Sequence, residues 1–307
     1  MQSKLVSLKE AVAGFIKDGG RLVIGASLEA AIPFAATFEL IRQGKRQLDL
    51  IAPISDASAD MLIGAGCAGS ITGAWVGNVS GGLGHNYRRA MEHGLPHPLK
   101  VNDFSNFSLA MALMAGAYGM PFVPVRSLLG SDITQSNPDH KILQNPLSEA
   151  PDPVVLVKPL VPDVAIFSVP RSDVFGNAHF WGSLGVVQEA ALAAKSVILL
   201  ADEIVEPAVI ASDPNRVIFP GFKVKAVAHE PASQYPSPMT GCWKRDNAFF
   251  NDYHQRSRDR EGYLAWLEEW VLSQADHAAL RAKLGKRLDE LRIKGTALAA
   301  PANFASE

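Results

Sequence analysis

One stretch of the sequence predicts a short apolar strand between glycines, followed by a loop and a helix: Asp18-Gly-Gly-Arg-Leu-Val-Ile-Gly-Ala-Ser-Leu-Glu-Ala-Ala-Ile-Pro33. Residues 22–24 are the apolar centre of the strand, and Gly25 and Ala26 leave the backbone at its carboxyl end open to close approach. Ligands of open α/β sheets bind at the carboxyl ends of strands. The stretch therefore predicts a binding loop, and an ordinary tight turn between a strand and a helix is the competing interpretation.

The same alternation of short strands and helices extends outward from this stretch. Ser7 and Glu10 have the spacing of a capping box, which predicts a helix just before the strand. The pattern predicts an α/β fold with an open, mainly parallel sheet and helices on both faces. Segment 207–260, rich in proline, glycine, serine and aromatic residues, predicts long ordered loops. We expect strands at 21–25, 48–52, 70–75, 122–125, 154–157, 163–169, 197–201, 217–219 and 225–229, and helices at about 30–43, 57–65, 86–93, 106–118, 184–195, 259–272 and 276–292.

Composition excludes several classes of protein. The chain has 307 residues, of which 48% are hydrophobic, and a formal charge of −2, which fits a globular protein with a sizeable core. We expect no nucleic-acid partner, because no basic run is present, and no membrane span or signal peptide, because long apolar runs are lacking. Cys67 and Cys242 are too few for a disulfide framework and fit a reducing cytoplasm. We expect a single domain over 1–307 with a C-terminal helical segment at about 259–292.

A second glycine-rich loop, Gly77-Asn-Val-Ser-Gly-Gly-Leu-Gly-His85, also follows a predicted strand. Its glycines would leave backbone amides free to face an oxyanion or a phosphate, with a flexible connection as the alternative. We expect Ser80 to donate or accept hydrogen bonds in a pocket rather than act as a nucleophile, because the chain contains no G-x-S-x-G elbow. The segments 130–132 and 173–178 follow predicted strands as well. Together the four loops predict one composite pocket for an extended ligand.

Two other patterns carry less weight. Gly64-Ala-Gly-Cys-Ala-Gly69 matches a dinucleotide-binding fingerprint, but a predicted helix precedes it and a strand follows it, the reverse of the order that a pyrophosphate site needs. His93 and His97 are four residues apart, yet Gly94 and Pro96 between them prevent a shared helical face. We therefore expect no nucleotide site at the first pattern and no metal site at the second.

The loops resemble those of the A-type subunit of the family I CoA-transferases, most closely the glutaconate CoA-transferase type. The family signature has an acidic residue with glycine, three apolar residues, Gly-Gly-Phe and then Gly-x-Pro. This chain keeps Asp18, Gly19, Gly25 and Pro33, and has Ala26, Ser27 and Ala31 at three other signature positions. The resemblance runs nearly the whole length and implies the CoA-transferase fold, which is similar to that of the NagB and RpiA proteins. Further segments that follow the family in order are 60–64, 78–81, 119–124, 130–131, 163–166, 181–182, 202–204, 220–221, 236–238 and 266–271.

The resemblance implies covalent catalysis by a carboxylate. A glutamate attacks an acyl-CoA thioester, an acyl–enzyme anhydride and then a glutamyl-CoA thioester form, and CoA passes to a second carboxylic acid. In two-subunit members that glutamate lies in the B-type subunit, and this chain lacks the Ser-Glu-Asn-Gly type of segment that carries it. The resemblance thus implies no catalytic nucleophile and no metal in this chain, coenzyme A as part of the substrate, and an obligatory B-type partner in a heterodimer or heterotetramer. The substrate-binding residues that it implies are Gly25, Ala26, Ser27, Leu28, Glu29, Asn78, Ser80, Gly81 and Gly82, of which Ser27, Asn78 and Ser80 would supply the polar contacts.

Alternatives to a transferase stay open at this point. Some relatives hydrolyse cyclic CoA thioesters from steroid rings with a carboxylate of the A-type subunit, and Asp103 is the only acid of this chain in the corresponding region. Glu29 either faces the pocket or lies in the first turn of the following helix, where the helix dipole favours a carboxylate. The apolar residues around Ser27 suit a bulky acyl group. An acyl-CoA hydrolase is therefore the alternative reaction, and non-catalytic metabolite sensing is a third interpretation.

Overall fold

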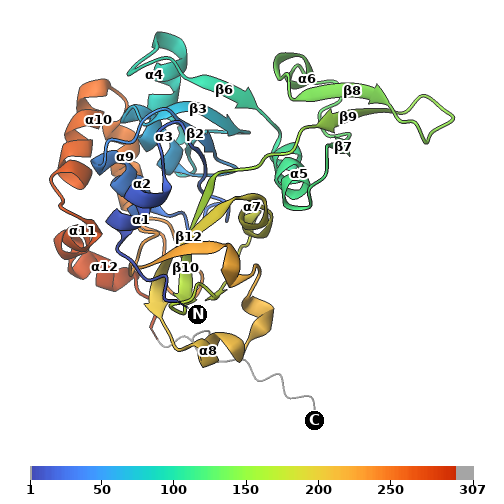
Figure 1. The fold of residues 1–307 in the computed structure, drawn as a ribbon. Coiled ribbons are helices and arrows are strands. Elements are labelled where there is room, and N and C mark those ends of the chain that lie inside the picture. Colours follow the sequence, from blue (N-terminus) through green and yellow to red (C-terminus); the bar gives the residue numbers. More distant parts are fainter. Residues whose placement is uncertain (1, 295–307) are drawn as a thin grey trace.

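The computed structural model describes residues 2–294, which build a central sheet with helices on both faces (Figure 1). Strand β1 lies in the middle of its seven parallel strands, and the chain adds β2, β3 and β6 on one side and β10, β12 and β13 on the other. The order of the strands thus reverses at β1, and open sheets bind ligands at the carboxyl end of such a switch point. In sheet order the strands are β13 (Val224–His229), β12 (Ser196–Ile204), β10 (Val164–Ser172), β1 (Arg21–Val23), β2 (Leu48–Ile51), β3 (Ala68–Gly73) and β6 (Lys100–Asp103), with β11 (Ala178–His179) antiparallel to β10.

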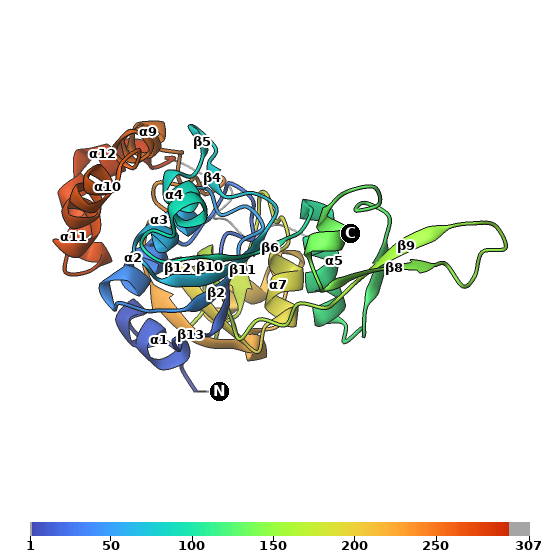
Figure 2. The same cartoon turned by 90° about the horizontal axis from the view of Figure 1, so that it is seen from above.

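Both faces of the central sheet are buried. Within β1, Leu22 packs into the core on one face and Val23 into the core on the other, as the two-residue period of a strand requires. The helices on the first face are α1 (Leu8–Phe15), α2 (Phe34–Arg42) and α3 (Ala57–Gly64), and those on the second are α5 (Asn106–Ala117) and α7 (Val187–Ala193) (Figure 2). The predicted capping box starts α1, because Ser7 and Glu10 each accept a hydrogen bond from the other's amide.

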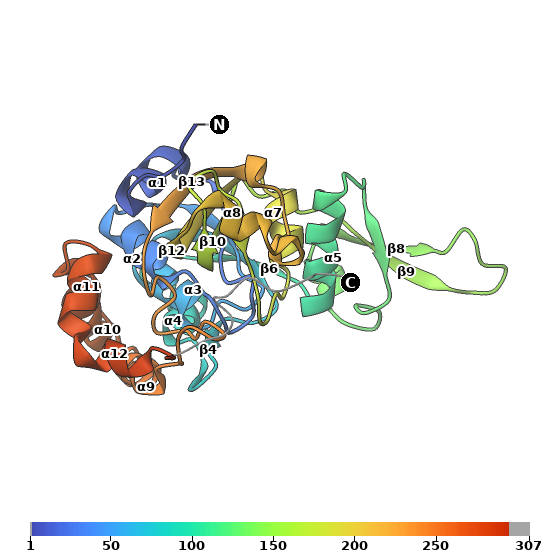
Figure 3. The same ribbon diagram turned by 90° about the horizontal axis from the view of Figure 1, so that it is seen from below.

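A small antiparallel sheet stands apart from the central one. It contains β7 (Val123–Val125), β9 (Pro153–Val157) and β8 (His140–Gln144), with α6 (Ile133–Ser136) preceding β8. Strands β8 and β9 project from the body as an arm in all the ribbon views (Figures 1, 2 and 3), and Leu147 at its tip is 93% exposed. The strands predicted at 122–125 and 154–157 therefore form, but outside the parallel sheet.

The first half of the chain differs from the prediction in several places. The helix predicted at 30–43 begins only at Phe34, because turns with positive φ at Leu28 and Ala31 precede it. The glycine-rich loop at 77–85 contains a short hairpin, β4 (Gly77–Asn78) with β5 (Gly82–Leu83), before α4 (His85–His93). Edge strand β6 was not predicted either. The pattern at 64–69 ends α3 and leads into β3, as expected.

The second half holds more helix than its composition predicts. Segment 207–260 includes α8 (Pro207–Ala211) and α9 (Asn247–Arg256), and the strand predicted at 217–219 is wrong, because these residues lie between 3₁₀ turns at Pro214–Arg216 and Gly221–Lys223. The segment predicted as helical at about 259–292 comprises α10 (Arg260–Leu267), a π-helix (Glu268–Leu272), α11 (His277–Leu284) and α12 (Lys286–Leu291).

Gly285, with φ of +50°, divides the helix predicted at 276–292 into α11 and α12. That conformation suits glycine and does not continue a helix. Residues 295–307 of the predicted single domain lie outside the described residues. Among the helices of residues 2–294, none has the length and apolar character needed to cross a membrane.

Candidate functional site

The loop Gly25–Glu29 leaves the carboxyl end of β1 at the switch point of the sheet. Gly25 has φ of +73°, and a Cβ atom added there would lie 2.5 Å from Cα of Ser55, so only glycine lets the ends of β1 and β2 approach so closely. The other side of the loop is fixed by the Val186 amide, which donates to the Ala26 carbonyl at 2.8 Å. The Ser237 hydroxyl donates to the Glu29 carbonyl. Three distant segments therefore hold this loop in one shape.

Several polar groups of this loop have no partner within residues 2–294. The amides of Gly25, Ala26 and Ser27 are buried and donate no hydrogen bond there, and the Ser27 hydroxyl makes none. The neighbouring Ser55 hydroxyl is also buried and unpaired. Buried donors without acceptors are rare and costly, and a ligand or partner group commonly satisfies them. The loop thus offers a cluster of donors suited to an oxyanion.

The hairpin at 77–84 does not offer the free amides that its glycines predicted. The Val79 amide donates to Oδ1 of Asp56 at 2.9 Å, and the Ser80 amide donates to Oδ1 of Asn78 at 2.9 Å. The Gly81 amide donates to the Asn78 carbonyl at 2.9 Å. The glycines serve the β4–β5 pairing instead, so any oxyanion donors come from the 25–27 amides rather than from this hairpin.

Asp56 and Arg245 join the hairpin to the rest of the site. Oδ2 of Asp56 lies 2.7 Å from a guanidinium nitrogen of Arg245, and the same nitrogen donates to the Ser80 hydroxyl at 3.0 Å. Burial raises the pKa of Asp56, the Arg245 charge opposes that shift, and the charge of Glu29 adds to it. Glu29 is therefore within electrostatic reach of Asp56, and residues 54–56, which were not predicted, contact both Gly25 and the hairpin at 77–84.

The predicted binding residues differ in whether their polar atoms are available to bind a ligand. Both polar atoms of the buried Asn78 side chain are used inside the protein, because its amide nitrogen donates to the Phe250 carbonyl at 2.7 Å and its oxygen accepts from Ser80. The Ser80 hydroxyl contacts Arg245 and Asn247. Leu28 and the hairpin tip at Gly81 and Gly82 face solvent. Ser27 is thus the only predicted polar residue whose hydroxyl is free within the described part of the chain.

The two acids singled out from the sequence lie apart. Glu29 is exposed and sits in a turn five residues before α2 begins, so its assignment to the first turn of that helix is wrong. Asp103 is exposed at the carboxyl end of edge strand β6, three strands from β1. Nothing in the described structure links Asp103 to the unpaired amides at 25–27.

Of the four loops predicted to form one pocket, the contacts link only those at 25–33 and 77–85, through Ser55 and Asp56. Segment 130–132 follows β7, which belongs to the separate sheet, so that loop does not lie at the carboxyl edge of the central sheet. Asp173 uses its side chain to close its own turn, accepting from the Phe175 and Asn177 amides at 2.8 and 2.9 Å. The site is built instead from the loops after β1, β2 and β3 and from the segment around Arg245.

Sequence reasoning missed Ser55, Asp56 and Arg245. The first two follow the predicted strand at 48–52, so the rule that pointed to the other loops applied to them as well. Arg245 carries no local signal, because it reaches Ser80 from 165 residues away in the chain.

Comparison with known proteins identifies the family of the chain. Residues 5–230 match the family described as coenzyme A transferase. The chain belongs to the coenzyme A transferase family. It is 37% identical over 284 residues to the A-type subunit of 3-oxoadipate CoA-transferase from Pseudomonas knackmussii, covering 92% of this chain and 99% of that one. It is 31% identical over 309 residues to the A-type subunit of glutaconate CoA-transferase from Acidaminococcus fermentans, covering 95% of each chain.

Two solved structures share the fold of this chain, and one of them is a CoA-transferase. Glutaconate CoA-transferase from Acidaminococcus fermentans matches with a TM-score of 0.90 and 29% identity over 99% of this chain and 100% of that one. A variant of the decarboxylase AibA/AibB matches with a TM-score of 0.72 and 26% identity over 87% of this chain and 100% of that one. The chain is thus the A-type subunit of a CoA-transferase with the predicted fold, and the hydrolase alternative is not favoured.

In this CoA-transferase, polar groups connect α4, the helix that follows the hairpin, to α3 and α9. Asp60 is fully buried and accepts from the Tyr253 hydroxyl at 2.5 Å and from the Tyr87 amide at 2.7 Å. Nε2 of His85 lies 3.2 Å from Nε2 of His254. Burial lowers the pKa of His85 to about 4, and the neighbouring histidine and three nearby arginines act in the same direction. The histidine pair is therefore neutral near pH 7.

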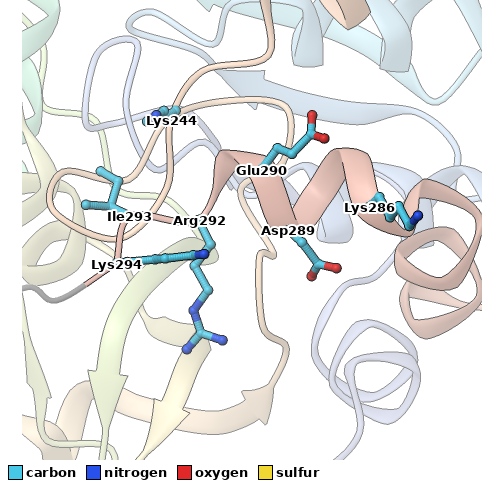
Figure 4. Close-up of a pocket in the computed structure, with 7 residues that line it drawn as sticks. All are labelled: Lys244, Lys286, Asp289, Glu290, Arg292, Ile293 and Lys294. Atoms are coloured by element: carbon cyan, nitrogen blue, oxygen red, sulfur yellow. The ribbon is translucent and has the colours of Figure 1, made fainter.

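Another pocket of the CoA-transferase chain lies at the C-terminal helices (Figure 4). Lys286, Asp289 and Glu290 come from α12, and Lys244 comes from the loop beside it. None of its lining residues belongs to the loops at 25–29, 54–56 or 77–84. This pocket is separate from the loops that form the candidate site.

Proposed function

We propose that this chain supplies the acyl-binding wall and the oxyanion donors of a two-subunit CoA-transferase whose nucleophilic glutamate belongs to the B-type subunit. The observation that carries the proposal is the set of buried, unpaired amides at Gly25, Ala26 and Ser27, placed at the switch point of the sheet. Asp56 is committed to Arg245 and to the Val79 amide, which leaves Glu29 as the one uncommitted acid of these loops. The site therefore has donors for an oxyanion, and Glu29 is the acid of this chain that the test of the proposal must exclude as the nucleophile.

The reaction follows from that division of labour. The glutamate carboxylate attacks the thioester carbonyl, and CoA leaves as a thiolate from the tetrahedral intermediate, which yields an acyl-glutamyl anhydride. The thiolate then attacks the glutamyl carbonyl, forming the glutamyl-CoA thioester and releasing the first acid as its carboxylate. A second carboxylate reverses these steps and takes up CoA. Each tetrahedral oxyanion would accept from the 25–27 amides, and one such donor contributes about 3–4 kcal/mol to a transition state.

The rim of the site supports docking of the B-type subunit on this edge. Leu28, Val79, Leu83 and Leu184 are each between 38% and 43% exposed although they are large and apolar. Leu28 belongs to the donor loop, and Val79 and Leu83 flank the hairpin tip. Exposed apolar residues around a polar centre are typical of an interface with another protein. A partner docked on them would exclude water from the unpaired amides while presenting its glutamate.

The two named relatives act on 3-oxoadipate and glutaconate, which are both dicarboxylic acids. We therefore propose a short dicarboxylic acid as one substrate of this enzyme, with a bulky apolar acid as the alternative that the loop around Ser27 suggested. Both cysteines are free, which fits the cytoplasm as the compartment.

The test is reconstitution with the B-type subunit. Each chain alone, and then their mixture, is assayed for CoA transfer from acyl-CoA donors to dicarboxylic and to bulky monocarboxylic acids. The proposal predicts activity only in the mixture, with a carboxylic acid as acceptor. Release of free CoA with water as the only acceptor would instead establish a hydrolase. Turnover by this chain alone would refute the placement of the nucleophile in the partner.

A further inference from the structure

Arg245 occupies a central position that its place in the sequence does not suggest. Its guanidinium lies over the ring of Phe250 at 3.9 Å, and its Nε donates to Oδ1 of Asn247 at 3.0 Å. From there it contacts Oδ2 of Asp56 at 2.7 Å and the Ser80 hydroxyl at 3.0 Å. One side chain therefore joins the segment before α9, the start of α3 and the tip of the hairpin.

Asp56 is held in an unusual conformation. Its φ is +47°, which a residue with a side chain adopts at a cost, and the surrounding structure must compensate. It occupies the N-cap position of α3, yet its side chain caps no helical amide. One carboxylate oxygen instead accepts from the Val79 amide of the hairpin, and the other faces Arg245. Helix capping thus does not account for this aspartate, whereas its contacts with the hairpin do.

A second anchor lies on the same hairpin. The Asn78 side chain donates to the Phe250 carbonyl at 2.7 Å, and Phe250 is also the residue whose ring supports Arg245. The hairpin is consequently fixed to α9 through Asn78 and to the start of α3 through Val79 and Asp56, with Arg245 touching both attachments. Loss of Arg245 would leave Asp56 buried without its countercharge and would leave the Ser80 hydroxyl with only its 3.4 Å contact to Asn247.

We propose that Arg245, acting through Asp56, is a positioning residue that fixes the 77–84 hairpin against the donor loop at 25–29, and that the rate of acyl transfer depends on it. The effect on rate rests on the proposed function, whereas the effect on the hairpin does not. A displacement of about 1 Å in a positioning element is enough to slow an enzyme about 100-fold. Loss of this clamp therefore lowers kcat more than it raises KM.

The chain contains a matched control. Arg287 pairs with Asp246 at 2.6 and 2.8 Å, so it is also an arginine holding a buried aspartate. That pair attaches α12 to the segment before α9 and contacts none of the loops at 25–29, 54–56 or 77–84. Asp246 directly follows Arg245 in the chain, so Arg287→Gln reports the effect of breaking such a pair at the same place while the contacts of Arg245 with Asp56 and Ser80 stay.

The experiment compares Arg245→Gln, Arg245→Lys and Arg287→Gln by amide hydrogen exchange of the isolated chain and by steady-state kinetics with the B-type subunit. We expect Arg245→Gln to lose protection across residues 77–84 and about 100-fold in kcat, with KM for acyl-CoA within about threefold. Arg245→Lys should recover part of both, because it keeps the charge beside Asp56. Arg287→Gln should keep hairpin protection and kcat per folded molecule.

A double variant guards against simple misfolding. Arg245→Gln with Asp56→Asn removes both charges together, so no carboxylate is left buried and unpaired. If this folded protein, like Arg245→Gln, kept wild-type protection at 77–84 and wild-type kcat, the clamp would be refuted. If the wild-type pair of chains transfers no CoA, the proposed function fails, and the exchange data on the chain alone still decide whether Arg245 holds the hairpin.

Discussion

Gly25→Ala is the substitution that tests the architecture of the site most severely. Gly25 has φ of +73°, and a Cβ there would lie 2.5 Å from Cα of Ser55 and 2.7 Å from the Ile54 carbonyl oxygen. An alanine in the left-handed region costs about 1–2 kcal/mol. Forcing a methyl group against fixed backbone costs about 1–3 kcal/mol more. The free energy of unfolding should therefore fall by about 2–5 kcal/mol, and the loops after β1 and β2 should move apart.

Gly19→Ala is a matched control at the other end of β1. Gly19 has φ of +74°, but a Cβ there would have no atom within 4 Å. The free energy of unfolding of Gly19→Ala should therefore fall only by the cost of the left-handed conformation, about 1–2 kcal/mol. The difference between the two variants thus isolates the close approach of the donor loop to Ser55.

Chemical denaturation of both variants measures the loss in stability, and the CoA-transfer assay with the B-type subunit measures the loss in activity. Under the proposed role of the 25–27 amides as oxyanion donors, their displacement in Gly25→Ala should lower kcat by at least about 100-fold, whereas Gly19→Ala should keep it. Equal stability and equal kcat for the two variants would show that the contact with Ser55 does not shape the site.

Three further outcomes follow from buried and exposed groups elsewhere. Burial raises the pKa of Glu230 to about 7, so at pH 8 the native protein carries a buried and unfavourable negative charge at this residue. Glu230→Gln removes that charge and should raise the free energy of unfolding by about 2 kcal/mol at pH 8. At about pH 4.5 the native glutamate is protonated, so the substitution should leave the free energy unchanged, and urea titration at both pH values measures the difference. Tyr253→Phe removes a donor to the buried Asp60 and should cost about 2 kcal/mol in the same measurement; an unchanged midpoint would contradict that contact. Leu147→Asp, at the tip of the arm, should leave unfolding within about 0.5 kcal/mol of wild type but weaken assembly with the B-type subunit in sedimentation experiments, because the exposed leucine fits an interface.

The sequence predicts the central sheet well, because its strands are buried on both faces and its helices carry strong local signals. The capping box at Ser7 and Glu10 and the strand at 22–24 are examples. Strand β8 of the arm could not be predicted from the sequence, because four of its five residues are exposed and its apolar residues follow no strand pattern. The 217–219 segment is apolar like a strand, yet 3₁₀ turns on both sides keep it out of the sheet.

The site is predictable only in part. Glycines at 25 and at 77–84 mark the two loops, because a tight backbone path leaves a trace in composition. The composition does not reveal which backbone amides lack a hydrogen-bond acceptor. The Val79 amide donates to an aspartate from another loop, whereas the Gly25 amide donates to no group of the described residues. Arg245 is invisible locally because only the fold brings it beside Asp56.

The most direct test of the account is where the covalent intermediate forms. The two-subunit enzyme is incubated with acyl-CoA, the glutamyl-CoA thioester is reduced with labelled borohydride, and the label is located by peptide mass spectrometry. The account predicts that the label falls on a single glutamate of the B-type subunit, with none on this chain. Label on Glu29, or on any other residue of this chain, would contradict it.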